Sequence, residues 1–150
     1  MSTGLEQLYQ QIILDHARAR HGSPLREYDG AGRAGESHQL NPVCGDEITL
    51  RAGLADGVVD TVTWDGAGCA ISMASASVLT DLVQGLPRDE VIALVDDFRE
   101  VMRSRGRIEA DEEVLGDAAA FSGVSRFPAR VKCAMLAWVA LEESLLAANA

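Results

Sequence analysis

The chain has 150 residues, of which 47% are hydrophobic, and it carries a formal net charge of −10. This length suits one domain over residues 1–150 with a single hydrophobic core, and no run approaches the ~20 apolar residues that a membrane span requires. The acidic charge argues against nucleic acid as a partner, because phosphate binding needs clustered lysine and arginine. It is compatible with docking onto a basic patch of another protein, or simply with solubility. The N-terminal residues lack a basic start followed by an apolar block, so we expect a cytoplasmic protein.

The N-terminal residues predict an amphipathic helix over residues 5–20. Thr3, followed three residues later by Glu6, fits a capping box at its start, and Gly22 with Pro24 ends it. The residues that recur at helical spacing are Leu5, Leu8, Tyr9, Ile12 and His16. We expect this side of the helix to pack against the rest of the protein.

The next stretch predicts a loop and then a β-hairpin. Glycines punctuate residues 26–37, which predicts a loop, and residues 38–40 allow a short edge strand. Residues 48–52 alternate between apolar and polar side chains, and residues 58–64 are β-branched and aromatic. These two runs predict antiparallel strands that are joined by a tight turn at Ala55–Gly57.

The remaining residues predict helices. Residues 69–84 are small and apolar, Pro87 opens a second helix, and Pro128 opens a long final one. The acidic stretch 109–121 predicts a short helix with loops. A hairpin followed by helices indicates an α+β fold, in which a small antiparallel sheet packs against helices.

The hexapeptide NPVCGD, which ends at Asp46, places a cysteine where a thiol is hard to bury. Cys44 precedes the first hairpin strand, and Cys69 follows the second. Antiparallel strands bring the start of one beside the end of the next, so Cys44, Asp46 and Cys69 should meet at one end of the hairpin. Cys133 lies in the first two turns of the last helix, which can point into the same corner, with Arg130 three residues earlier. Three thiolates and a carboxylate make a tetrahedral zinc site or an iron–sulfur site.

Plainer explanations compete with this one. Free cysteine is among the most buried residue types, so Cys133 also fits simple burial in the core. Asp46 alone is more often a turn residue than a metal ligand. The histidines have weak sequence context and the tryptophans have the character of packing residues: His16, His21, His38, Trp64 and Trp138. The spacing therefore supports a metal site without excluding an ordinary core.

Three motifs in order carry a family resemblance. NPVCGD, GAGCAISMASAS and FPARVKCAMLAW, together with the opening LEQLYQQIILDH, resemble the SufU family, a branch of the IscU/NifU-like iron–sulfur assembly proteins. Lys132 stands where IscU-type scaffolds usually have a histidine. Residues 103–123 look like the longer segment that SufU-like members have between the second and third cysteines. The Asn-Pro that usually follows the first helix is missing.

The resemblance implies a zinc-dependent sulfurtransferase that receives persulfide sulfur from a SufS-type cysteine desulfurase and serves downstream iron–sulfur assembly proteins. It implies that Zn²⁺ is held by Cys44, Asp46, Cys69 and Cys133. It also implies that Cys44 is the sulfur acceptor and that Arg130 acts beside the site. Because zinc lowers the nucleophilicity of a thiolate, we expect Cys44 to leave the metal before it accepts sulfur, with Pro42 and Gly45 as a hinge-like setting. A histidine of the desulfurase would take its place.

Three other functions remain open at this point. The first is an iron–sulfur scaffold that assembles a cluster on the same ligands, which Lys132 and the longer segment disfavour. The second is a structural zinc module, although such sites usually use cysteine and histidine rather than aspartate. The third is a Cys–His hydrolase, for which no histidine has a supporting motif.

Overall fold

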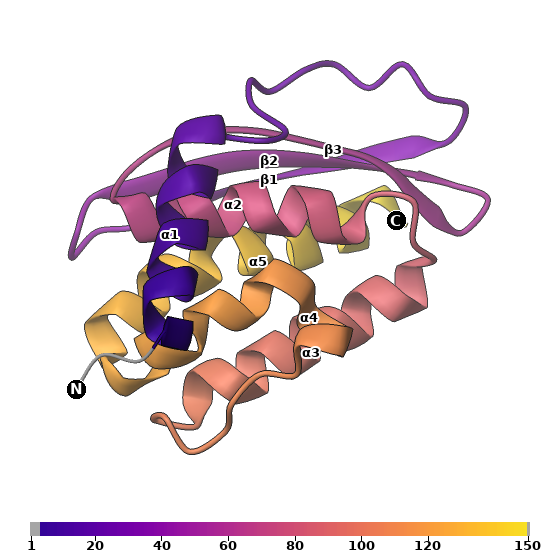
Figure 1. Cartoon of the computed structure of the whole chain (residues 1–150). Helices are drawn as coiled ribbons and strands as arrows, with labels where there is room; N and C mark the ends of the chain where they lie inside the picture. The colour runs from indigo at the N-terminus through magenta and orange to yellow at the C-terminus, as the bar shows by residue number, and fades with distance from the viewer. Residues whose placement is uncertain (1–3, 150) are drawn as a thin grey trace.

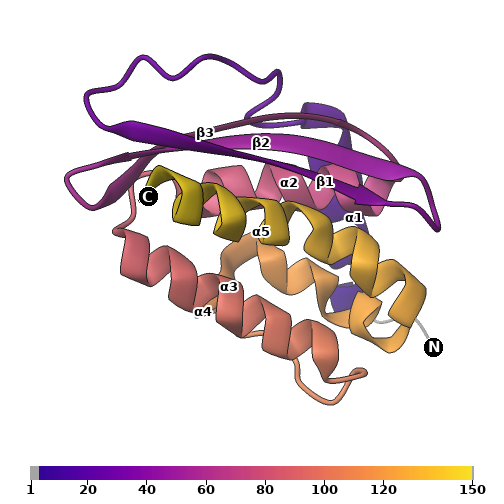
Figure 2. The same ribbon diagram turned by 180° about the vertical axis from the view of Figure 1, so that it is seen from behind.

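A three-stranded antiparallel sheet forms one layer of the protein, and helices cover one of its faces (Figure 1). The computed structural model describes residues 4–149. Helices α2 (Ala70–Val83) and α5 (Pro128–Ala148) run against the sheet. Helices α3 (Arg88–Arg103) and α4 (Glu112–Leu115) lie beyond them, as the reverse view also shows (Figure 2). The α+β fold predicted from the sequence is therefore confirmed.

The sheet has the strand order β1-β2-β3, and its central strand carries the site described below. The strands are β1 (Arg33–Asn41), β2 (Asp46–Ala55) and β3 (Val58–Ala67). The predicted tight turn joins β2 to β3, with positive φ angles of 52° at Asp56 and 77° at Gly57. Two successive residues with positive φ are typical of the primed turns that match the twist of a hairpin.

Strand β1 is longer than the sequence predicts. It begins at Arg33, whereas the glycines of residues 26–37 predict a loop and only residues 38–40 an edge strand. Gly35 is buried against α5, where a side-chain Cβ would lie 2.6 Å from the backbone nitrogen of Ala148. The glycine at this position marks a close approach of a helix to the strand, and the loop prediction holds for residues 26–32 but was wrong for residues 33–37.

Helix α1 (Gly4–Ala19) packs against α2 and the 3₁₀ helix η1 (Gly116–Arg126). Leu5 and Leu8 are 42% and 54% exposed, so the prediction that they pack was wrong. Tyr9 and His16 do pack, as predicted, and they are joined by Ile13 and Ala17. Thr3, the predicted cap, lies outside the described residues.

The core lies between the sheet and the helices. Trp64 on β3 and Trp138 on α5 are both fully buried, which confirms that they are packing residues. The ring of Phe98 on α3 stacks on Trp138 with 4.2 Å between the ring centroids, so it ties the outer helical layer to the inner one. Among residues 4–149, no helix is long and apolar enough to cross a membrane.

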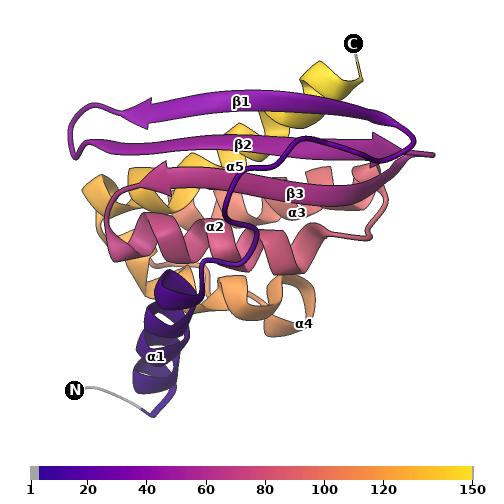
Figure 3. The same ribbon diagram turned by 90° about the horizontal axis from the view of Figure 1, so that it is seen from above.

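The segment that follows α1 crosses the sheet on its way to β1, as the view from above shows (Figure 3). Its first residues are fixed along the free edge of β3. The Trp64 backbone N–H donates to the carbonyl of Gly22 at 3.0 Å, and the Trp64 indole N–H donates to the carbonyl of His21 at 2.7 Å. The residues just after α1 are therefore held in place by the sheet.

Candidate metal centre

The turn between β1 and β2 carries Cys44 at one end of the sheet. The Gly45 N–H donates to the Asn41 carbonyl at 2.8 Å, and the Val43 N–H donates to the Asn41 side chain at 3.2 Å. Gly45 has a φ of 75°, a conformation that favours glycine. Asn41 is buried, so it anchors both bonds from inside the protein. The turn is short and closed, and it leaves the Cys44 side chain exposed.

Asp46 follows this turn as the first residue of β2. Side chains in a strand alternate between faces, so Asp46 points to the same side as Ile48 and Leu50, toward the helices. It is only 1% exposed. The Ser72 hydroxyl donates to its Oδ2 at 2.5 Å, and the Cys69 backbone N–H donates to its Oδ1 at 3.0 Å. A buried carboxylate is thus held by the first turn of α2.

Cys69 and Cys133 approach Asp46 from two different helices. Cys69 caps the N-terminus of α2, and its Sγ lies 3.6 Å from Asp46 Oδ2. Cys133 lies in the second turn of α5 and is buried. Its Sγ lies 3.5 Å from the Sγ of Cys44, which in turn lies 3.2 Å from Asp46 Oδ2. The structure therefore brings together all four residues that the sequence predicted, and we call them the thiol–carboxylate group.

The separations within this group fit a tetrahedral metal. With Zn–S near 2.3 Å and Zn–O near 2.1 Å, two sulfur ligands lie ~3.8 Å apart and a sulfur and an oxygen ~3.6 Å apart. The observed distances are 3.5 Å between Cys44 and Cys133 and 3.2 and 3.6 Å from Asp46 to the two exposed thiols. Cys44, Asp46 and Cys133 offer ligand atoms that all lie within 4.8 Å of one another. Cys69 is not part of that 4.8 Å set, but its Sγ lies 3.6 Å from Asp46 Oδ2.

Within this group, the pKa of the carboxylate and the pKa of the buried thiol shift in opposite directions. Burial alone would raise the pKa of Asp46, but hydrogen bonds from Cys133, Ser72 and the Cys69 N–H outweigh burial and lower it to about 2. Burial raises the pKa of the Cys133 thiol well above its usual value, and the neighbouring Asp46 and Cys44 raise it further. Without a metal, the group therefore holds a carboxylate beside a protonated thiol. A cation that binds there must displace that proton.

Arg130 lies at the rim of the group rather than inside it. Its side chain is exposed, and its guanidinium lies 5.8 Å from the ring centroid of Phe127. Within residues 4–149, no hydrogen bond of its side chain to the thiol–carboxylate group is seen. Lys132 is also exposed.

Sequence reasoning missed two residues that position the group. Ser72 holds Asp46, and Asn41 closes the turn that carries Cys44. The signal for Ser72 was present, because it follows Cys69 by three residues and shares its face of α2. Gly68 also matters, because a Cβ there would lie 2.8 Å from the carboxyl carbon of Asp46.

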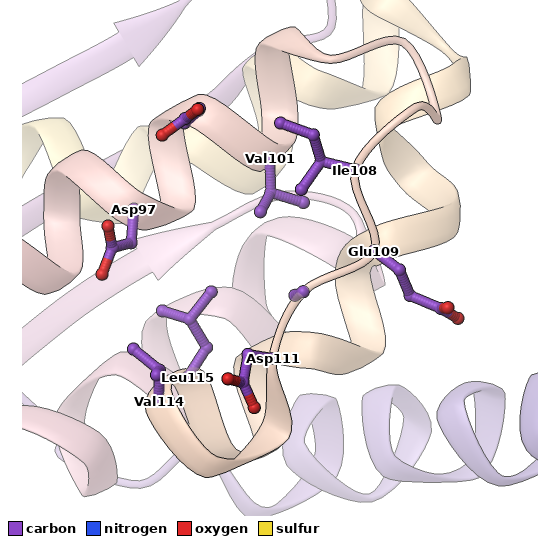
Figure 4. A pocket seen from close by; sticks show the side chains of 9 residues that line it. Asp97, Val101, Ile108, Glu109, Asp111, Val114 and Leu115 are labelled. Atoms are coloured by element: carbon purple, nitrogen blue, oxygen red, sulfur yellow. The ribbon is translucent and has the colours of Figure 1, made fainter.

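A cavity of about 260 Å³ opens elsewhere, between α3 and α4 (Figure 4). Its lining combines apolar side chains with the carboxylates of Asp97, Glu100, Glu109 and Asp111. It contains no cysteine or histidine. Because a metal ion needs converging ligand atoms and not a large cavity, the thiol–carboxylate group is the stronger candidate for chemistry.

The fold and this group define a small α+β protein with a candidate metal centre at the open end of a β-hairpin. Known proteins that resemble this chain share its α+β fold. The chain belongs to the NifU-like N terminal domain family, whose model matches residues 8–134.

Relatives carry two kinds of name. The chain is 38% identical over 142 residues to the iron–sulfur cluster assembly scaffold protein IscU of Streptococcus pyogenes serotype M1, covering 94% of this chain and 84% of that protein. It is 36% identical over 148 residues to the zinc-dependent sulfurtransferase SufU of Bacillus subtilis (strain 168), covering 96% and 93%.

A solved structure extends the comparison to three dimensions. It is described as an iron–sulfur cluster assembly scaffold protein for the SUF system from Fervidobacterium islandicum AW-1. It matches with a TM-score of 0.75 at 32% identity, covering 93% of this chain and 98% of that one. The predicted resemblance is confirmed for the family, and relatives of both names lie at similar identity.

Proposed function

We propose that this chain is a zinc-dependent sulfur acceptor in iron–sulfur cluster assembly, taking persulfide sulfur from a SufS-type cysteine desulfurase. One observation carries the proposal: Cys44 is exposed on a closed turn, while Asp46 and Cys133 beside it are buried. A sulfur acceptor needs a thiol within reach of its donor and next to groups that stay in place. The name of the Bacillus relative, a zinc-dependent sulfurtransferase, supports this reading.

We assign Cys44, Asp46, Cys69 and Cys133 as the zinc ligands. Bound zinc would keep the thiols deprotonated and moderate their reactivity until the donor arrives. Asp46 is oriented by Ser72 and by the Cys69 N–H, which leaves its charge directed at the thiols. Cys133 is fixed by its place on α5.

Cys44 is the acceptor in this proposal. Its thiolate attacks the outer sulfur of the donor persulfide. A new S–S bond forms on Cys44, the S–S bond of the donor breaks, and the donor cysteine leaves as a thiolate with the electron pair of that bond. The sulfur is then carried as a persulfide on Cys44 to downstream assembly proteins.

Exposure alone does not select Cys44, because Cys69 is exposed too. The backbone of Cys69 is engaged on both sides: its N–H donates to Asp46 at 3.0 Å and its carbonyl accepts from Met73 at 3.1 Å. Moving the Cys69 backbone would disrupt the start of α2, so its thiol can move only by side-chain rotation, and the choice of Cys44 as acceptor rests on the family resemblance. Because Asn41 closes the turn, we place the motion of Cys44 in rotation of its own side chain, in place of a hinge at Pro42 and Gly45.

The rim of the group offers contacts for the donor enzyme. Val43, next to Cys44, is 81% exposed, and Phe127, at the start of α5, is 56% exposed. Arg130 lies over Phe127, and we assign it to the contact with the anionic persulfide donor. The three cysteines are free thiols, and we place the reaction in the cytoplasm, where thiols are kept reduced.

Mapping the transferred sulfur tests the proposal. The protein is mixed with a SufS-type desulfurase and cysteine, alkylated and digested, and the persulfide is located by mass spectrometry. We expect it on Cys44, and we expect Cys44→Ala to lose both the adduct and the stimulation of desulfurase turnover. Unchanged stimulation by Cys44→Ala, or a persulfide found only on Cys69, would refute the assignment.

An iron–sulfur scaffold is the second candidate, and the relatives named IscU favour it. Three thiols and a carboxylate can also ligate a cluster. Anaerobic reconstitution with iron and sulfide separates the two functions. A cluster that survives purification and passes to an apo-protein would favour the scaffold, whereas bound zinc without visible absorption would favour the acceptor.

A further inference from the structure

A second group of metal-binding side chains lies where α1 ends against α2. His16, His21 and Asp81 each offer a ligand atom, and these atoms all lie within 4.8 Å of one another. None of these residues belongs to the thiol–carboxylate group, and the function proposed above makes no use of them. The two imidazole rings meet edge to face, with 5.3 Å between their centroids.

The backbone of His21 is fixed, although its side chain is half-exposed. Its N–H donates to the Ser77 hydroxyl oxygen at 3.0 Å, and its carbonyl accepts from the Trp64 indole at 2.7 Å. Next to it, a Cβ on Gly22 would lie 2.7 Å from the Thr80 hydroxyl, so this segment packs tightly on α2. The His21 ring can therefore rotate at an anchored position.

The hydrogen bonds of His16 orient its ring. Nδ1 lies 2.8 Å from the Ser77 hydroxyl, and Nε2 lies 3.0 Å from an Asp117 carboxylate oxygen. His16 is 8% exposed, whereas the side chains of His21 and Asp81 are about half exposed at 49% and 50%. One ligand is thus buried and oriented, and two face solvent, which leaves an open path for an ion.

The charges around the group favour a cation. Two carboxylates face the rings, because Asp81 lies 2.6 Å from His21 Nδ1 and Asp117 lies beside His16. His16 also lies in the last turn of α1, where the helix dipole favours positive charge. The nearby Arg20 points elsewhere, because its guanidinium donates to the Gly66 carbonyl and lies over the Trp64 ring.

We propose that His16, His21 and Asp81 form a second metal site, independent of the thiol–carboxylate group, for a divalent transition-metal ion. Two imidazoles and one carboxylate suit zinc, cobalt, nickel or iron(II), and leave positions open to water. Because both ring nitrogens of His16 are hydrogen-bonded, the one that binds the metal must give up its bond to Ser77 or to Asp117, and the other partner would set the ring orientation. His21 Nδ1 and Asp81 Oδ2 lie 2.6 Å apart in a direct hydrogen bond, so these two exposed side chains must rotate to let an ion in between them.

Cobalt(II) is the probe, because its spectrum separates the two sites. The full-length protein, His21→Ala, Asp81→Asn and the control His38→Ala are titrated with Co²⁺ and the bound metal is measured by equilibrium dialysis. His38 is a suitable control, because it is another exposed histidine paired with a carboxylate, at 2.8 Å from Glu47, on a different face. Cobalt at the thiols gives a thiolate-to-cobalt charge-transfer band, and cobalt at the histidines does not.

We expect the wild type and His38→Ala to bind one Co²⁺ more than His21→Ala, without added charge-transfer absorption, and Asp81→Asn to bind that ion at least 10-fold more weakly. Circular dichroism shows whether each variant is folded. Asp81→Asn, which preserves side-chain shape, decides the outcome if His21→Ala is unfolded. Equal cobalt binding by the wild type and the folded variants would overturn the proposal. So would loss of the ion in His38→Ala, or a charge-transfer band for the additional ion.

Discussion

Gly68→Ala tests whether the position of Asp46 determines metal binding. A Cβ at residue 68 would lie 2.8 Å from the Asp46 carboxyl carbon and 3.1 Å from its Cβ, and closer still to Oδ1. Real Cβ contacts essentially never fall below 3.0 Å, so one of the two residues must move. Asp46 is buried, and its Oδ1 accepts the Cys69 N–H at 3.0 Å, so any shift strains that bond.

The expected cost follows from these contacts. Overpacking a buried site costs about 1–3 kcal/mol. Loss of a hydrogen bond to a charged group adds about 1.5–3 kcal/mol. We therefore expect Gly68→Ala to lower the free energy of unfolding by at least about 2 kcal/mol and to weaken zinc binding strongly, because the carboxylate leaves its position beside the thiols.

Gly123→Ala is the matched control, since a Cβ there meets nothing within 4 Å. Urea unfolding of the metal-free proteins gives the stability difference, and competition with a chromophoric chelator gives zinc affinity. Equal stability and zinc affinity in the two variants would refute the geometry described here. Lower stability with undiminished zinc affinity would show that Asp46 is not a ligand.

Three further substitutions test the surroundings of the site and the fold. Ser72→Ala should weaken zinc binding about 10–100-fold in chelator competition, because Asp46 loses the hydroxyl that orients it; unchanged affinity would contradict this role. Gly35→Ala should lower the free energy of unfolding in urea by the upper part of the overpacking range, about 3 kcal/mol, because the new Cβ meets the backbone of α5; a wild-type free energy of unfolding would contradict the close packing. In Tyr9, the hydrogen bond to Glu112, burial and the Glu112 charge raise the pKa to about 12, so its stabilisation is present below pH 10 and lost as the pH rises toward 12. Tyr9→Phe should remove the tyrosinate absorbance step near pH 12, and persistence of that step would contradict the assignment.

The hairpin and its three site residues, Cys44, Asp46 and Cys69, were predictable because they depend on interactions between residues close in sequence. The period-two pattern of β2 and the turn at Asp56 and Gly57 determine the strand pairing, which aligns Glu47 with Ala67 and so brings Asp46 beside Cys69. That inference needs only the alternation of side chains along the strand, which sets the register, and a tight turn.

The approach of Cys133 and the extent of β1 depend on contacts between distant segments. Helix α5 lies close to the sheet because Gly35 has no side chain and because the Ser144 hydroxyl donates to the Leu50 carbonyl at 3.0 Å. A glycine that accommodates a helix and one that forms a loop look alike in a sequence. The sequence pattern therefore predicts a loop at Gly35, and it indicates only that Cys133 can point into the same corner, with no physical reason that fixes it there.

Acid should affect the thiol–carboxylate group in two separate steps. Zinc binding requires the Cys133 thiol to lose its proton, and burial raises its pKa, so protons compete with zinc well above the pKa of Asp46. In the metal-free protein, the pKa of Asp46 falls from 3.8 to about 2. A depressed carboxyl pKa stabilises the fold above about pH 4, and this stabilisation is lost as the pH falls toward 2. The shift corresponds to about 2 kcal/mol.

Zinc release, followed with a chromophoric dye, should therefore precede the stability loss that the Asp46 carboxyl causes. Between pH 4 and pH 2, metal-free wild type should lose about 2 kcal/mol more unfolding free energy than Asp46→Asn, which has no carboxyl to protonate. Parallel losses in the two proteins would show that the hydrogen bonds from Ser72 and Cys69 do not stabilise the ionised carboxylate. Simultaneous zinc release and unfolding would show that the centre has no separate acid sensitivity, and that the buried thiol does not control when the metal leaves.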